Sequence, residues 1–267
     1  MNAPLPMSLR LAHLFGSAIN GASLSDPKIE RLPFTVRLVE NDEDLLKAVD
    51  IRHSAYARHM PVFAESLLQP EGLDTTDGVF VLLAESKLDG SPLGTCRIQT
   101  NRYQRLSVEQ SVTLPSSFDG LALAEVTRLG VAQGGAGRLV KMALIKAAFM
   151  VCEREGIDWA IVAGRAPIDR QYQQLLFGDL FPEIGFIEMS HAGNVPHRVM
   201  GFEIATGNER WTDANHPLLG FFSHTRHVDI QVDKVFPSQS EEHVPGNALH
   251  ARVAPTLHNK SEANIAR

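Results

Sequence analysis

One stretch of the chain decides the fold: Ala124-Glu125-Val126-Thr127-Arg128-Leu129-Gly130-Val131, followed at once by Ala132-Gln133-Gly134-Gly135-Ala136-Gly137-Arg138. The first segment has the pattern of a β-strand that carries two charged residues. The second is a glycine-rich turn that leads into an apolar helix pattern. Because the first N–H groups of a helix have no partner within the helix, they readily bind an anion. The stretch therefore predicts a strand, a turn and a helix start that bind a phosphate group.

Length, composition and charge restrict the class of protein to which this strand–turn–helix element can belong. The chain has 267 residues, 44% of them hydrophobic, which is enough for one large domain or two small ones. A formal charge of −6 argues against nucleic-acid binding, which needs a basic surface, so phosphate binding should be local. Cys96 and Cys152 lie in apolar patterns and are expected to be core thiols in a reducing compartment. With no signal peptide and no apolar run of roughly 18 residues, we expect a soluble, cytoplasmic protein.

Hydrophobic periodicity divides the chain into an N-terminal arm (1–33), a folded domain (34–232) and a polar C-terminal tail (233–267). In the domain, strands precede a strand–helix–strand succession, which indicates a mixed α/β or α+β fold. Asn41 is predicted to cap the first helix of the domain. The expected strands are 34–39, 79–84, 93–100, 121–131, 157–163, 186–190 and 199–204, and the expected helices are 9–19, 42–59, 139–155 and 168–180.

Charged residues interrupt several of these apolar patterns. Arg52 falls on the apolar face of the helix 42–59, and a buried arginine needs an anion. Arg97 lies on a predicted strand, while Asp74 and Asp77 lie in a turn before another strand. Each has a simpler structural explanation, because arginines form ordinary surface ion pairs and aspartates are common in turns.

Glu125 and Arg128 lie three residues apart on their strand, so they face opposite sides of the sheet unless a bulge near Gly130 reorients one of them. They could also form a purely structural ion pair. The histidines lack the spacing of a metal site, so no metal is predicted; the clustered ones are His191, His197, His216, His224 and His227.

Four motifs follow one another along the chain: Arg52-His53-Ser54-Ala55-Tyr56, Asp74-x-x-Asp77, Gly94-Thr95-Cys96-Arg97 and Glu125-Val126-Thr127-Arg128 with the following Leu129-Gly130-Val131. In this order they resemble the motifs of acyl-homoserine-lactone synthases and of the related N-acyl amino acid synthases, which share the GNAT (Gcn5-related N-acetyltransferase) core. The similarity spans residues 34–204. It is closer to the N-acyl amino acid synthases, because Met60-Pro61-Val62-Phe63 stands where the lactone synthases have a tryptophan and because the acidic loop is less complete.

The resemblance implies a GNAT-like α/β (α+β) fold with a mixed central sheet flanked by helices and a V-shaped opening between two central strands. It implies Glu125 as general base and Arg128 beside it as catalytic residues. Substrate-binding residues would be Arg52, Tyr56, Asp74, Asp77 and Arg97. Whether Arg52, Arg97 or Arg128 binds the acceptor or braces the acidic loop stays open. Phosphopantetheine-binding residues would be Leu129, Val131, Gln133, Gly134, Gly135, Gly137 and Arg138.

The implied reaction moves a fatty acyl group from acyl carrier protein to the amine of an amino acid. The acyl-phosphopantetheine thioester is a co-substrate, and no cofactor or metal is expected. Gln133, Ala136 and Arg138 match the GNAT pyrophosphate loop only in part, which favours carrier protein over coenzyme A as donor. A hydrophobic product suggests peripheral contact with the inner membrane. The alternatives are an acyl-homoserine-lactone synthase, a coenzyme A-dependent N-acetyltransferase and a non-catalytic module that docks carrier protein.

Overall fold

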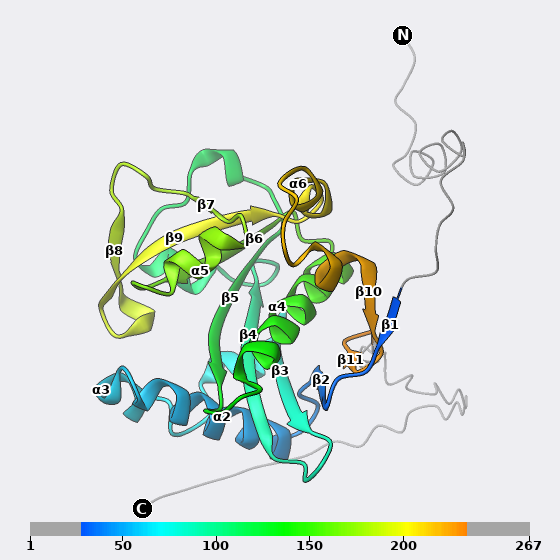
Figure 1. Cartoon of the computed structure of the whole chain (residues 1–267). Helices are drawn as coiled ribbons and strands as arrows, with labels where there is room; N and C mark the ends of the chain where they lie inside the picture. Colours follow the sequence, from blue (N-terminus) through cyan, green and yellow to red (C-terminus); the bar gives the residue numbers. More distant parts are fainter. Residues whose placement is uncertain (1–27, 234–267) are drawn as a thin grey trace, which may run out of the picture. The chain divides into compact units, whose positions relative to one another are not determined.

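A nine-stranded mixed sheet forms the centre of the computed structural model, which describes residues 28–233 (Figure 1). Its strand order is β11-β2-β3-β4-β5-β6-β9-β7, with β8 paired to β9. Neighbouring strands are antiparallel except in the pairs β11–β2 and β5–β6. The predicted mixed sheet is therefore confirmed. The predicted helix at 9–19 and the tail beyond residue 233 lie outside the described residues.

The elements follow the predicted order closely. The strands are β1 (Lys28–Glu30), β2 (Phe34–Leu38), β3 (Val79–Ser86), β4 (Pro92–Thr100), β5 (Leu123–Val131), β6 (Trp159–Gly164), β7 (Gly178–Asp179), β8 (Phe186–Met189), β9 (Val195–Glu203), β10 (Thr225–His227) and β11 (Ile230–Gln231). The longer helices are α2 (Asp42–Ala57), α3 (Pro61–Glu65), α4 (Gly137–Arg154), α5 (Asp169–Gln174) and α6 (Gly207–Asp213). Short helical turns are η2 (Gly72–Thr75), η3 (Ser107–Gln110), η4 (Ser116–Phe118), η5 (Ser190–Ala192) and η6 (Gly220–His224).

Helices α2 and α4 cover opposite faces of the sheet (Figure 1). Alternate residues of β3 show this, because Val81 and Leu83 pack with α2 whereas Leu82 and Ala84 pack with α4. The predicted apolar face of α4 is buried: it consists of Val140, Leu144, Ala147, Ala148 and Val151. At the start of α2, Asn41 Oδ1 accepts a hydrogen bond from the Asp44 N–H at 2.9 Å, which confirms the predicted cap.

Several parts of the chain differ from the prediction, among them α3 and α6, which the sequence analysis did not include. The helix expected over 168–180 ends at Gln174, because Leu176 takes a left-handed conformation (φ 69°) and the following residues pair with β9 as β7. Phe177 is thereby buried against Phe149 and Phe202. Three short strands were also not predicted: β1 pairs with β10, and β11 extends the sheet beside β2. Strands of two or three residues leave too little periodicity to be recognised.

The centre of the sheet opens at β5. Strand β5 pairs with β4 along its length but with β6 only at Leu123, Ala124 and Glu125. Beyond Glu125 no further β5–β6 pairs form, although β6 continues to Gly164 beside β9. The two parallel strands therefore diverge, as the V-shaped opening requires.

A β-bulge accompanies this divergence. Between the pairs Thr95–Gly130 and Arg97–Thr127, β4 advances by two residues and β5 by three. Arg128 absorbs the extra residue with φ 55°, an uncommon conformation outside glycine. The bulge turns Arg128 to the side of the sheet on which Glu125 and Thr127 lie, so the conditional prediction of a bulge is confirmed.

Gly130 lets α2 approach β5 closely at this bulge. A Cβ atom at residue 130 would lie 2.9 Å from Cβ of Ala55, which has no rotamer that relieves the clash. Gly130→Ala should therefore lower the free energy of unfolding by about 1–3 kcal/mol through overpacking. Denaturant unfolding would measure this, with Gly220→Ala as the control because nothing lies within 4 Å of its added Cβ. Equal stability of the two variants would contradict the close packing.

Candidate active site

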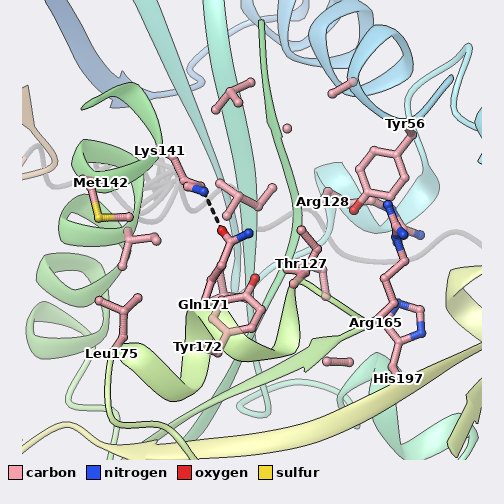
Figure 2. Close-up of a pocket in the computed structure, with 18 of the residues that line it drawn as sticks. Tyr56, Thr127, Arg128, Lys141, Met142, Arg165, Gln171, Tyr172, Leu175 and His197 are labelled. Carbon is pink, nitrogen blue, oxygen red and sulfur yellow. Dashed lines mark hydrogen bonds between the residues drawn. The ribbon is translucent and has the colours of Figure 1, made fainter. Parts of the chain in front are cut away.

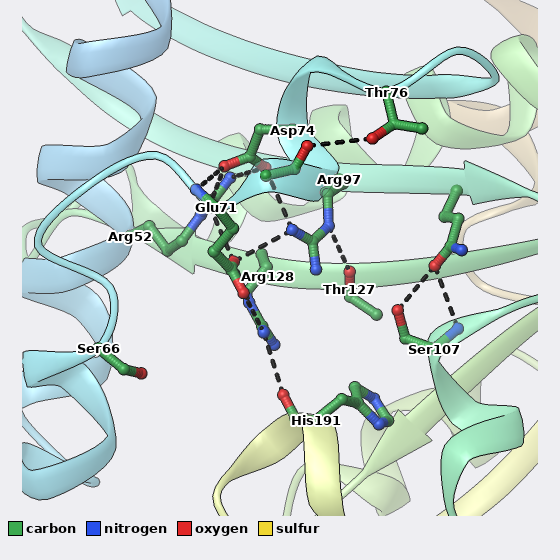
Figure 3. A network of polar contacts seen from close by, with 12 residues as sticks. Arg52, Ser66, Glu71, Asp74, Thr76, Arg97, Ser107, Thr127, Arg128 and His191 are labelled. Atoms are coloured by element: carbon green, nitrogen blue, oxygen red, sulfur yellow. Dashed lines mark hydrogen bonds and ion pairs between the residues drawn. The ribbon is translucent and has the colours of Figure 1, made fainter.

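Three arginines from different elements meet two carboxylates beneath the bulge (Figure 3). Asp74 receives a bidentate pair from Arg52, with Nη1–Oδ2 at 2.8 Å and Nη2–Oδ1 at 3.0 Å. Glu71 receives a second bidentate pair from Arg128, with Nε–Oε2 at 2.7 Å and Nη2–Oε1 at 2.6 Å. Arg97 Nη1 joins both carboxylates, at 3.1 Å from Glu71 and 3.2 Å from Asp74. We call these five residues the arginine–carboxylate network.

Because the network is buried, each of its charges is costly unless an opposite charge lies close to it. Arg52 and Arg97 are 0% and 1% exposed, so each guanidinium needs a close anion. Burial alone would raise the pKa of Asp74, but the hydrogen bonds and charges of Arg52 and Arg97 lower it below its ordinary value. The pKa of Glu71 is lowered by Arg128 and the other two arginines in the same way, against the effect of burial. Both groups therefore stay ionised at neutral pH and stabilise the fold until the pH falls below about 4.

The structure brings Arg52, Asp74, Arg97 and Arg128 together as the motifs predict, but it leaves Asp77 out. Asp77 is exposed and lies outside the network. Its place is taken by Glu71, which the motif did not include. A capping box links Glu71 to Asp74, since the Asp74 carboxylate accepts from the Glu71 N–H at 2.9 Å. The spacing Glu71-x-x-Asp74 is the sequence signal that could have identified it.

A cavity of about 790 Å³ occupies the space between the diverging strands. Figure 2 shows its two sides: Met142 and Leu175 on one, Arg128, Arg165 and His197 on the other. The backbone of β5 borders both. The lining residues are Ala55, Tyr56, Arg58, His59, Met60, 126–131, Arg138, Lys141, Met142, Ile145, Ala163, Arg165, Ile168, Gln171, Tyr172, Gln174, Leu175, His191, Ala192, His197 and 216–218.

The predicted phosphopantetheine-binding residues lie along one edge of this cavity. Leu129, Val131 and Arg138 line it, while Gln133, Gly134 and Gly135 form an exposed turn. Helix α4 begins directly after this turn at Gly137, and its N-cap, Ala136, offers no side-chain cap to the first N–H groups. The first N–H groups of α4 therefore have no side-chain cap, and phosphate binding by this turn stays a prediction.

Tyr56, a predicted substrate-binding residue, also lines the cavity, at the end of α2. Its ring packs edge to face against Phe63, with 5.8 Å between the ring centroids. The guanidinium of Arg128 lies 5.2 Å from the centroid of the same Phe63 ring. Phe63 therefore links Tyr56 to the arginine–carboxylate network.

Glu125 does not line the cavity. It is fully buried, and its Oε2 atom accepts a hydrogen bond from the Val108 N–H at 2.8 Å. Its Oε1 atom lies 3.2 Å from Nε2 of His191, and His191 itself lines the cavity. Sequence reasoning considered His191 only as a metal ligand and missed this contact, because η5 and β5 lie far apart in the chain. The candidate base predicted from the motif thus reaches the cavity only through a second residue.

Neither cysteine has the properties of a nucleophile. Both are free and buried, and burial raises the pKa of each thiol to about 12. At neutral pH almost no reactive thiolate would be present. Within residues 28–233, no group of three or more His, Cys, Asp or Glu side chains is arranged to hold a metal ion.

The fold is that of the GNAT acyltransferases. A solved structure of FeeM, an N-acyl amino acid synthase from uncultured soil microbes, is 15% identical, covers 70% of this chain and 96% of its own, and has a TM-score of 0.53. BjaI, a coenzyme A-dependent acyl-homoserine lactone synthase, is 12% identical over 73% of this chain and 93% of its own, with a TM-score of 0.46 that is too low to bear on function. No protein-family model matches the chain, and no curated protein matches it. At these identities the likeness shows the fold alone.

No helix of the described part of the chain is both long and apolar enough to cross a membrane.

Asp74 should be essential to stability whereas Asp77 should not. Asp74→Ala leaves Arg52 and Arg97 with an uncompensated buried charge, so we expect a loss of about 3–5 kcal/mol in the free energy of unfolding. Asp77→Ala removes an exposed side chain from the same loop and should change stability by less than about 0.5 kcal/mol. Urea unfolding of both variants would check this. A similar loss in both would contradict the arrangement of the network.

Proposed function

We propose that the protein is an N-acyltransferase that moves a fatty acyl group from the phosphopantetheine thioester of acyl carrier protein to the amine of an amino acid. The cavity beside β5 carries this proposal, because one side offers the apolar side chains of Met142, Ile145 and Leu175 beside the hydrogen-bonded pair Lys141–Gln171, whereas the other side carries Arg128 and Arg165. An acyl thioester and an amine that bears a carboxylate need these two surfaces. The fold shared with FeeM, an N-acyl amino acid synthase, supports the same reaction class.

The donor fits the apolar side. An apolar recess adjoins the cavity and shares Val126, Leu129, Ile145 and Tyr172 with it. The recess contains almost no polar surface, but its volume is only about 20 Å³, so a fatty acyl chain has to lie mainly in the adjoining cavity of about 790 Å³. With the acyl chain there, the pantetheine would extend along β5 toward Val131. Its phosphate would then reach the exposed turn and the uncapped start of α4.

Cations at the mouth of the cavity support a phosphorylated donor. Arg58 and Arg138 are exposed there, and Arg58 donates a hydrogen bond to the Val131 carbonyl at 2.8 Å. Among the described residues neither forms an ion pair. The glycine turn matches the pyrophosphate loop only in part, which favours a donor with a single phosphate, as in carrier protein.

The residue best placed to bind the carboxylate of the acceptor is not one of the three arginines expected from the sequence. Arg52, Arg97 and Arg128 already donate hydrogen bonds to the carboxylates of Glu71 and Asp74. Arg165 lines the same side of the cavity, and within residues 28–233 its one hydrogen bond goes to the carbonyl of its neighbour Ala166, at 3.5 Å. An arginine with free N–H groups suits bidentate binding of a carboxylate. We therefore assign the acceptor carboxylate to Arg165 and a bracing role to the network.

The reaction would be direct attack by the neutral amine on the thioester carbonyl. The new N–C bond forms, the C–S bond breaks, and the leaving thiolate takes up the proton that the amine gives to a base on the Glu125 side of the cavity. Backbone N–H groups of β5 near Leu129 and Val131 would polarise the carbonyl. The unreactive state of Cys96 supports a mechanism without an acyl-enzyme intermediate.

Mass spectrometry of reaction products would test the proposal. The purified protein would be incubated with long-chain acyl carrier protein and the common amino acids, with acyl-coenzyme A and S-adenosylmethionine in parallel reactions. The expected result is an N-acyl amino acid formed from carrier protein. Formation only from acyl-coenzyme A would contradict the donor, a homoserine lactone would contradict the acceptor, and absence of product from every donor would favour a docking module.

Arg165→Gln should weaken acceptor binding specifically. Loss of a charged hydrogen bond to a carboxylate typically costs about 1.5–3 kcal/mol, so the KM for the amino acid should rise about 10–100-fold. Arg170→Gln is the matched control, because Arg170 is exposed on α5 and does not line the cavity. Steady-state kinetics with an amine that lacks a carboxylate should show no difference between Arg165→Gln and wild type. An unchanged amino acid KM in Arg165→Gln would contradict the assignment.

A further inference from the structure

The carboxylate of Glu125 is separated from the cavity by the imidazole of His191. Glu125 is 0% exposed, and one of its oxygens is held by the Val108 N–H. The other oxygen, Oε1, lies 3.2 Å from His191 Nε2. His191 lines the cavity, and its side chain is 7% exposed. A substrate in the cavity would therefore meet His191 before Glu125.

Two buried polar atoms are unsatisfied at this place. Among the described residues, Glu125 Oε1 and His191 Nδ1 have no hydrogen-bond partner. Oε1 lies within hydrogen-bond distance of Nε2, but the angle between the two groups does not make a hydrogen bond, so the imidazole ring has to turn for the bond to form. A carboxylate can only accept, so His191 must carry its proton on Nε2 in that bond. The other nitrogen, Nδ1, is then a buried lone pair that needs a donor.

The backbone of η5 is fixed beside this pair. The His191 carbonyl accepts a hydrogen bond from Arg128 Nη2 at 3.0 Å, which ties η5 to the arginine–carboxylate network (Figure 3). The Ser190 N–H donates to the Ser111 hydroxyl at 2.9 Å. Gly193 ends η5 in a left-handed conformation, with φ 74°. The His191 backbone is therefore anchored on both sides of the imidazole.

We propose that His191 is the general base of the acyl transfer and that Glu125 is a positioning residue that sets its tautomer. This inference rests on the proposed function. His191 Nδ1, which is buried in the free protein, must turn toward the cavity and then takes a proton from the acceptor amine as the N–C bond forms. The C–S bond then breaks, and the imidazolium returns the proton to the thiolate. Glu125 keeps its contact with Nε2–H throughout and stabilises the imidazolium.

Several charged groups surround His191. Arg128 from β5 and Arg165 after β6 are the cations on this side of the cavity, and Glu125 is the carboxylate in contact with the imidazole. His197 from β9 is a second histidine on the same side. Burial lowers the pKa of His197, and the charges of His191 and Arg165 lower it further. His191 alone of these histidines contacts a carboxylate.

Steady-state kinetics of variants would separate catalysis from structure. His191→Gln should lower kcat about 10²–10⁴-fold with little change in the KM for the amino acid, and it should change the pH profile of kcat. Glu125→Gln should lower kcat by a smaller factor of about 10–100, because it acts through His191. His224→Gln is the control and should keep the wild-type pH profile, because His224 is exposed and does not line the cavity.

The opposite pattern would overturn the proposal. If His191→Gln keeps kcat and the pH profile while Glu125→Gln loses activity, Glu125 itself is the base. If wild type forms no product with any donor, the proposed function fails and the catalytic role of His191 fails with it.

Nitrogen-15 NMR of the histidine rings in the wild-type protein tests the pairing without relying on activity or on a folded variant. Neutral His191 with its proton on Nε2, and a changed ring signal in Glu125→Gln, would support the pair. A proton on Nδ1 would overturn it, whatever the protein catalyses.

Discussion

Neutralisation of Arg52 and Arg97 is the constraint on which the rest of the site depends. Both guanidinium groups lie in the protein interior, where an unpaired charge is costly. Glu71 and Asp74 meet this demand only because η2 folds over the sheet beside β4. Glu71 also accepts hydrogen bonds from Arg128, whose guanidinium donates a further hydrogen bond to the His191 carbonyl in η5. One charge requirement thus connects α2, β4, β5 and η5.

The bulge in β5 turns this network into a functional site. By rotating Arg128 out of the regular alternation, it places the charged network under one side of the diverging strands. The other side carries the apolar side chains of Met142, Ile145 and Leu175 beside the hydrogen bond between Lys141 and Gln171. A donor with a hydrocarbon tail and an acceptor with a charged group can therefore approach the same stretch of backbone from opposite sides. This separation is the physical basis of the proposed reaction.

Local chemistry allowed much of this to be predicted from sequence. Periodicity indicated β3 to β6 and α4, Asn41 marked the start of α2, and the misfit of Arg128 beside Glu125 pointed to a bulge. Contacts between distant segments were not predictable. Glu71 resembles an ordinary turn residue until η2 meets Arg52, and His191 meets Glu125 only after η5 folds against β5. Likewise, pairing of Gly178 with β9 ended α5 earlier than its apolar pattern indicated.

The central claim is that an acyl thioester lies along β5 where it leaves β6. A crystal structure with an acyl-pantetheine analogue, in which an amide replaces the thioester, would test it most directly. The account predicts the acyl chain against Val126 and Ile145, the carbonyl facing the backbone near Leu129, and the phosphate at the start of α4. An analogue bound outside this cavity, or with its chain on the side of Arg165 and His191, would contradict it.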